Sequence, residues 1–196
     1  MDHNLMKTDR LAKLLPYFQT TGITCGVVCA MMVRGALQGI ELTRDLEMSI
    51  CKELYSKRFG IVPVISLAGY LAREQLTVEA YHQDKHLFWD LLATDPIGRS
   101  VQEYRYQQAM LHGVTLFEPP LIDEAFLSRE IARERLVICG TMYHGIRHAV
   151  LLYDLINGNT HLIDPIEGVH SLKCDEFIAK MQTFAGVWCI SVGANE

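Results

Sequence analysis

The longest nearly continuous apolar segment of the chain lies close to its start. From Cys25 to Gln38 most side chains are apolar, and Gly39 follows directly. A helix that is apolar on most of its faces belongs at the centre of a fold, and a glycine just beyond its last turn is a common way for such a helix to end. The pattern therefore predicts a buried helix over residues 25–38.

Two amphipathic segments come next. Thr43 is a typical N-cap residue for a helix that reaches about residue 57, and Pro63 suits the first turn of a third helix over residues 64–74. The apolar residues of both segments recur at helical spacing. We expect the inward-facing residues to be Leu46, Ile50, Leu54, Leu67, Tyr70 and Leu71.

Strand patterns are concentrated in the second half of the chain. Asn157-Gly158 separates two of these patterns and is a signal for a tight hairpin. Helices first and an antiparallel sheet later predict an α+β fold in two halves that face each other across a cleft. The predicted strands are 76–81, 114–117, 136–142, 148–156, 160–163 and 187–192, and the predicted helices of this part are 87–93, 101–111, 123–134 and 175–181.

Length, composition and charge narrow the class of protein. The chain has 196 residues, of which 49% are hydrophobic, so we expect a single domain over residues 1–196 with one substantial core. A net charge of −5 with no clustered basic face argues against nucleic acid as a partner. The apolar stretches are too short to span a bilayer, and residues 1–8 contain no signal-peptide core. The expectation is a cytoplasmic protein without membrane insertion and with reduced cysteines; its oligomeric state is left open.

One of the six cysteines stands at a position that favours reactivity. Cys25 begins the predicted buried helix, where unpaired backbone N–H groups and the positive end of the helix dipole favour a thiolate. Gln19 lies six residues earlier, on the segment that leads into the helix. From there its amide could donate to an oxyanion formed when the thiolate attacks a carbonyl.

A base and an orienting carboxylate occur later in the chain. His148 begins a predicted strand, and Asp164 precedes Pro165 at the end of another. Taken singly, a buried cysteine, a histidine at a strand edge and an aspartate in a turn all have ordinary structural explanations. All of them in the order Gln, Cys, His, Asp form a much more specific signal for acyl-transfer chemistry.

These residues resemble the papain-like clan of cysteine peptidases. The resemblance rests on Gln19 with Cys25-Gly26, on the segment 148–151 and on Asp164-Pro165, and it extends over about residues 15–192. Within this clan, the sequence is most similar to the peptidases that remove double-glycine leaders from bacteriocins, and to their stand-alone relatives. One departure is Val27, where many of these relatives have proline.

The resemblance implies a papain-like two-part fold, with the nucleophile on the N-terminal helical half and the His and Asp on the C-terminal antiparallel sheet. It implies Cys25 as nucleophile, His148 as general base and acid, Asp164 as orienter and Gln19 as oxyanion donor. The implied substrate is a peptide or protein, and no cofactor is expected.

Other functions remain open at this point. An acyltransferase or a glutamine deamidase would use the same triad, and a non-catalytic peptide-binding module would use the same cleft. Zinc could be held by Cys25, Cys29, His144 and His148, since both pairs are four residues apart. Cys174, near a predicted helix start, is expected to be partly exposed.

If His148 and Asp164 lie on a symmetric hairpin that turns at Gly158, they are not directly opposite each other. Contact between them then requires a bulge or a bend.

Overall fold

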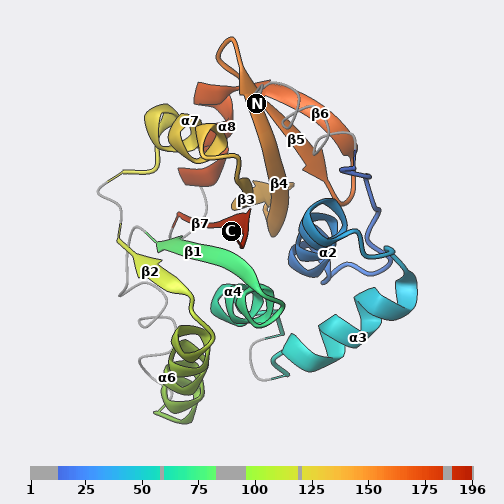
Figure 1. Ribbon diagram of the computed structural model, residues 1–196, viewed down its shortest axis with the longest axis vertical. Coiled ribbons are helices and arrows are strands. Elements are labelled where there is room, and N and C mark those ends of the chain that lie inside the picture. The colour runs from blue at the N-terminus through green and yellow to red at the C-terminus, as the bar shows by residue number, and fades with distance from the viewer. Residues whose placement is uncertain (1–12, 58–59, 83–95, 119–120, 183–186, 196) are drawn as a thin grey trace.

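A computed structural model describes residues 13–57, 60–82, 96–118, 121–182 and 187–195. Within these ranges it contains six α-helices and seven β-strands (Figure 1). The helices are α2 (Cys25–Gln38), α3 (Arg44–Leu54), α4 (Val64–Arg73), α6 (Pro96–Leu111), α7 (Glu124–Ala132) and α8 (Cys174–Gln182). The strands are β1 (Leu76–His82), β2 (Thr115–Phe117), β3 (Leu136–Tyr143), β4 (Ile146–Ile156), β5 (Asn159–Asp164), β6 (Gly168–Lys173) and β7 (Trp188–Ala194).

All seven strands form one sheet. Its order is β2-β1-β7-β3-β4-β5-β6, and every neighbouring pair is antiparallel except β1 and β2, which are parallel. The sheet therefore begins in the middle of the chain with β1 and β2, earlier than a strict division into a helical half and a sheet half requires. The predicted α+β class is confirmed.

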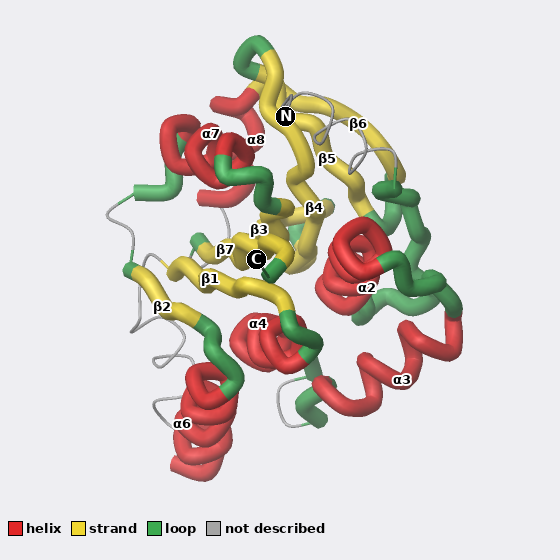
Figure 2. The backbone as a smooth tube through the Cα atoms, viewed as in Figure 1, coloured by secondary structure: helices red, strands yellow, loops and turns green. Residues whose placement is uncertain are grey.

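Helices cover both faces of the sheet and enclose two apolar cores. Alternate residues of a strand point to opposite faces, so neighbours on β4 belong to different cores. Leu151 packs in the core with α2 and α4, whereas Leu152 packs in the core with α7 and α8. Figures 1 and 2 show these two pairs of helices on opposite sides of the central strands.

Helix α2 occupies the centre of the first core, as its composition predicts. Its residues from Val27 to Val33 are all buried, and Gly39 ends the helix in the left-handed conformation (φ 70°). Because glycine lacks a Cβ atom, it adopts that conformation at little cost. The predicted bounds of this helix are confirmed.

The other predicted elements are mostly present, with some corrections. Helix α3 ends at residue 54 rather than 57, although the predicted cap is confirmed because the Leu46 N–H donates to Thr43 Oγ1 at 3.2 Å. Strand β6 was not predicted, because its residues include Gly168 and several polar side chains. Cys174 is buried, so the expected partial exposure was wrong. The predicted helix over residues 87–93 lies outside the described residues.

No helix in the described part of the chain combines the length and the apolar character needed to cross a membrane.

Candidate functional site

Cys25 is the first residue of α2 and differs from the other cysteines in its exposure. Its side chain is partly exposed, while the remaining five cysteines are buried and none of the six forms a disulfide. Burial raises the pKa of the Cys174 thiol to about 11 and raises the pKa of Cys29 well above its usual value. Buried thiols of this kind stay protonated and unreactive.

The start of α2 lies directly against strand β4. A Cβ atom placed on Gly26 would lie 4.0 Å from the Cβ of Ala149, the residue that follows His148. That distance is an ordinary van der Waals contact, so the first turn of α2 packs directly against β4 at this point. This contact brings Cys25 to the end of the strand that carries His148.

His148 and Asp164 form a buried pair. The His148 Nε2 atom lies 2.9 Å from Asp164 Oδ1, and the two residues are only 5% and 4% exposed. The His148 imidazole is also hydrogen-bonded to the Cys25 thiol. Because Asp164 engages Nε2, Nδ1 is the ring nitrogen left to exchange a proton with Cys25.

The surroundings of His148 favour its protonated form. Burial by itself lowers the pKa of the imidazole, but the hydrogen bonds and charges of Asp164 and Cys25 outweigh it and raise the pKa to about 9. Burial likewise favours neutral Asp164, yet the bond to His148 and two backbone N–H groups lower the pKa of that carboxyl. The pair is therefore an imidazolium and a carboxylate at neutral pH.

A bulge in the hairpin allows His148 and Asp164 to meet. The β4–β5 pairing shifts by one residue at Tyr153, and beyond that point Leu151 pairs with Ile163. Asp164 thus continues the register opposite Val150, on the face of the sheet that His148 shares. Without the extra residue Asp164 would lie opposite Leu151 and point to the other face. The expectation that contact requires a bulge or a bend is confirmed.

The turn after β5 holds the Asp164 carboxylate in place. Its Oδ1 atom accepts hydrogen bonds from the backbone N–H groups of Ile166 at 2.6 Å and Glu167 at 3.2 Å. This is the aspartate turn that the Asp-Pro sequence indicates. The same carboxylate oxygen therefore bonds both to the turn that ends the strand and to His148.

Gln19 lies beside this turn. Its backbone N–H donates to the carbonyl of Pro165 at 2.9 Å, which ties the segment before α2 to the residue after Asp164. The side-chain Oε1 atom of Gln19 is buried without a hydrogen-bond partner among the described residues. Unsatisfied polar atoms of this kind are uncommon in folded proteins and occur more often at functional sites.

Exposed apolar side chains occur close to each of these residues in the chain. Four exposed apolar side chains lie within two positions of the four candidate residues, namely Phe18, Ile23, Ile146 and Ile166. His148 and Asp164 also line an open pocket with an empty volume of about 320 Å³, surrounding solvent included. Its other lining residues include Met142, Glu167, His170 and Lys180.

The structure does not bring together the four residues considered for zinc. The thiol of Cys29 is directed to the carbonyl of Ala149 at 3.6 Å, and His148 is bonded to Asp164 and Cys25. In the described part of the chain, no three His, Cys, Asp or Glu side chains are grouped as a metal ion requires. What the structure brings together instead is Cys25, His148 and Asp164, joined by hydrogen bonds.

Sequence reasoning missed one buried carboxylate next to the site. Glu47 of α3 is fully buried and accepts hydrogen bonds from the segment that contains Gln19. It shares the buried face of α3 with Ile50, Cys51 and Leu54, so a charged residue at an inward-facing position was the available signal.

The overall structure is similar to that of solved peptidase domains. The peptidase domain of Streptococcus ComA, a bifunctional ABC transporter involved in a quorum-sensing pathway, matches with a TM-score of 0.52 at 10% identity. That match covers 93% of this chain and 99% of that one. This chain has the fold of that peptidase domain. A double-glycine-motif protease from an AMS/PCAT transporter, solved in complex with the leader peptide, matches with a TM-score of 0.51 at 14% identity and covers 93% and 94% of the two chains.

The papain-like α+β fold predicted from the sequence is thus confirmed. No protein-family model matches the sequence, and comparison with curated proteins finds no match either. The similarity is one of fold, since sequence identities of 10% and 14% carry no information on specificity.

Proposed function

We propose that this protein is a cysteine peptidase that cleaves a peptide bond through a thioester on Cys25. The observation that carries the proposal is the hydrogen-bonded series Cys25–His148–Asp164 at the start of a buried helix. The peptidase-domain fold supports it, because the same architecture is found in domains described as peptidases.

The first half of the proposed reaction forms the thioester. The Cys25 thiolate attacks the carbonyl carbon of the substrate, and the carbonyl electrons move to the oxygen. The backbone N–H of Cys25 and the amide of Gln19 donate to that oxyanion. As it collapses, the His148 imidazolium gives its proton to the leaving nitrogen and the C–N bond breaks.

The second half releases the acid. His148, now neutral, takes a proton from water as the water oxygen attacks the thioester, and the C–S bond breaks to restore the thiolate and the imidazolium. Asp164 keeps the imidazole oriented and stabilises its charge throughout. The acid released in this step is the N-terminal part of the substrate.

We further propose a peptide with two glycines before the cleaved bond as the substrate class. The likeness of fold to a double-glycine-motif protease solved in complex with the leader peptide supports this proposal. Small residues on the acyl side would also suit a nucleophile in the first turn of a helix that lies close to a strand.

The test uses a peptide that ends in Gly-Gly linked to a fluorogenic amine, with a matched Ala-Ala peptide for comparison. Wild-type protein should release the amine and Cys25→Ala should not, while Cys29→Ala should retain activity. Intact-mass analysis of Asp164→Ala mixed with peptide should show an acyl adduct on Cys25. No adduct and no release would refute the peptidase proposal.

The products separate the related functions. Release of acid in the presence of a primary amine supports hydrolysis, whereas a dominant amide product would mean an acyltransferase. Loss of ammonia from a glutamine side chain would mean a deamidase. Binding of the Gly-Gly peptide without an adduct would mean a peptide-binding module.

A further inference from the structure

Glu47 is a charged residue in an unusual place. It is fully buried on the inner face of α3, and no lysine or arginine among the described residues forms an ion pair with it. A buried carboxylate is costly unless hydrogen bonds replace the water it has lost. Its partners therefore indicate what it does.

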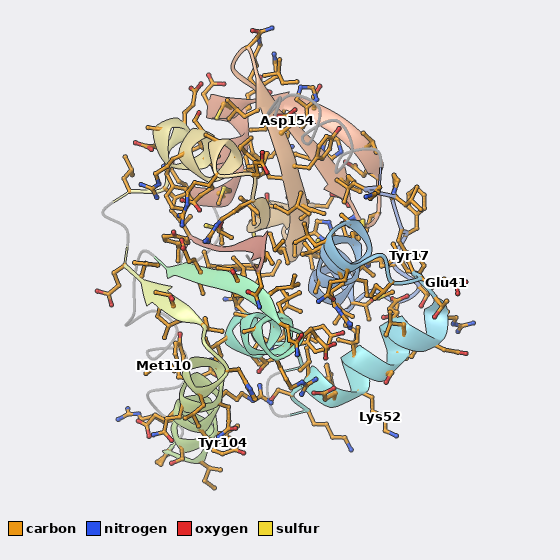
Figure 3. All side chains as sticks on the ribbon, viewed as in Figure 1. Tyr17, Glu41, Lys52, Tyr104, Met110 and Asp154 are labelled. Carbon is orange, nitrogen blue, oxygen red and sulfur yellow. The ribbon has the colours of Figure 1, made fainter. Side chains whose placement is uncertain are left out.

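Among the described residues, all hydrogen-bond partners of its carboxylate belong to the segment 17–24 that precedes α2. Glu47 Oε1 accepts from the backbone N–H of Thr20 at 3.0 Å and from the hydroxyl of Thr24 at 2.5 Å. Glu47 Oε2 accepts from the hydroxyl of Tyr17 at 3.3 Å. Tyr17 is labelled in Figure 3, between α2 and α3. One side chain thus ties three points of an eight-residue segment to α3.

The N-terminal end of α3 stabilises the Glu47 carboxylate and fixes its position. Glu47 lies in the first turn of the helix, where the positive end of the dipole stabilises a negative charge. The α3 N-cap, Thr43, fixes that turn through its bond with the Leu46 N–H. The carboxylate is therefore held on a rigid element before it meets the segment.

Gln19 lies between two of the attachments. Its own N–H is bound by the Pro165 carbonyl on the sheet side, and the next N–H, of Thr20, is bound by Glu47 on the helical side. The peptide N–H of Gln19 is thus fixed to the sheet that carries Asp164. The peptide N–H that follows it is fixed to the helical part that carries Cys25.

We propose that Glu47 is a positioning residue that holds Gln19 at the oxyanion site by fixing the Thr20 N–H and the Thr24 hydroxyl. The role rests on the proposed peptidase function. Glu47 touches neither the substrate nor the reacting atoms, and it acts through the backbone of the segment.

The experiment compares Glu47→Ala and Glu47→Gln with Asp45→Ala as the matched control. Asp45 is an exposed acidic residue in the same first turn, so its loss removes a charge from α3 without touching the segment. The Glu47→Gln variant keeps an acceptor oxygen for Thr20 and Thr24 but has no negative charge. It therefore separates the effect of the hydrogen bonds from the effect of the charge. Thermal melting identifies any variant that does not fold.

Two rates distinguish positioning from general damage. Amide turnover of the Gly-Gly peptide needs the oxyanion site, whereas alkylation of Cys25 by iodoacetamide is a displacement at carbon that forms no oxyanion. We expect Glu47→Ala to lower turnover by about 100-fold, the scale for losing one oxyanion donor, with alkylation changed less than about threefold. Glu47→Gln should stay within about tenfold of wild type, and Asp45→Ala should be unchanged.

A double variant tests whether Glu47 acts through Gln19. If it does, Gln19→Ala combined with Glu47→Ala should be about as slow as Gln19→Ala alone, because both remove the same interaction. Additive losses, a parallel fall in alkylation, or a folded Glu47→Gln as slow as Glu47→Ala would each overturn the proposal.

Amide hydrogen exchange provides a readout that needs no substrate. Glu47→Ala should lose protection at Thr20, while Asp45→Ala keeps it. If the wild type cleaves no peptide but Thr20 is deprotected as expected, the peptidase function fails and the structural link stands. If Thr20 stays protected in Glu47→Ala, the positioning role fails whatever the activity.

Discussion

Removal of the Asp164 carboxylate should lower the pKa of His148 by more than one unit. In the intact protein that pKa is raised from 6.5 to about 9, against the lowering effect of burial, and the hydrogen bond with Asp164 is the largest single contribution that raises it. The rise corresponds to about 3 kcal/mol in favour of the imidazolium, at roughly 1.4 kcal/mol per unit. Asp164 and Cys25 together provide that energy. In the Asp164→Ala variant, the His148 imidazole should therefore titrate below about pH 8.

The sign of the effect on stability follows from the same shift. The protonated His148 is stabilised in the folded state, so its contribution is complete below pH 6.5 and is lost as the pH rises towards about 9. The pKa of Asp164 is lowered, so its contribution is present above 3.8 and is lost as the pH falls through the folded-state value. The difference in unfolding free energy between wild type and Asp164→Ala should be largest between pH 3.8 and pH 6.5, where both contributions are complete.

The assay is an NMR titration of the His148 ring. The chain has eight histidines, so the signal is assigned by its absence in His148→Gln. Asp164→Asn keeps a hydrogen-bond acceptor without the charge and should lie between wild type and Asp164→Ala, and Cys25→Ala should shift the pKa less than Asp164→Ala does. A wild-type pKa between 6 and 7 that is unchanged in Asp164→Ala would refute the coupling.

Three further predictions concern the site and the packing that supports it. Iodoacetamide should label Cys25 first in the folded protein, and peptide mapping that finds a buried cysteine labelled first would contradict the site. Deletion of Tyr153 should remove the bulge and abolish turnover while circular dichroism still reports folded protein, because Asp164 would then point to the other face of the sheet; retained turnover would show that the bulge is not needed. Gly140→Ala should destabilise the protein by about 2 kcal/mol or more in urea unfolding, the scale of an overpacked core, because its new Cβ would lie 2.4 Å from the Trp188 ring; an unchanged midpoint would mean that the indole can move.

Local features of the sequence were enough to predict most elements. The apolar segment before Gly39, the Thr43 cap and the Asn157-Gly158 turn each depend on neighbouring residues only. Asn157 and Gly158 both have the positive φ, 52° and 72°, that a tight hairpin turn of this kind requires. Strand β6 escaped prediction because edge strands are less apolar, and its pairing with β5 comes from the rest of the sheet.

The candidate residues could be chosen from the sequence, but their contact could not. The order of Gln19, Cys25, His148 and Asp164 and the resemblance to papain-like peptidases marked the four residues. Whether His148 and Asp164 share a face depends on one extra residue at Tyr153, and a one-residue change of register moves every later side chain to the opposite face.

The sequence by itself determined most of the helical and extended segments, though not β6, and it determined which residue types are available for chemistry. Periodicity, caps and turns act over a few residues, so they can be recognised along the chain. Tertiary structure alone decided that the carboxylate of Glu47 meets the segment before α2, that the Gln19 N–H meets the Pro165 carbonyl, and that five thiols are buried while Cys25 is not. These features depend on contacts between residues far apart in the chain, where burial and register are set by the packing of whole elements and no local pattern carries the information.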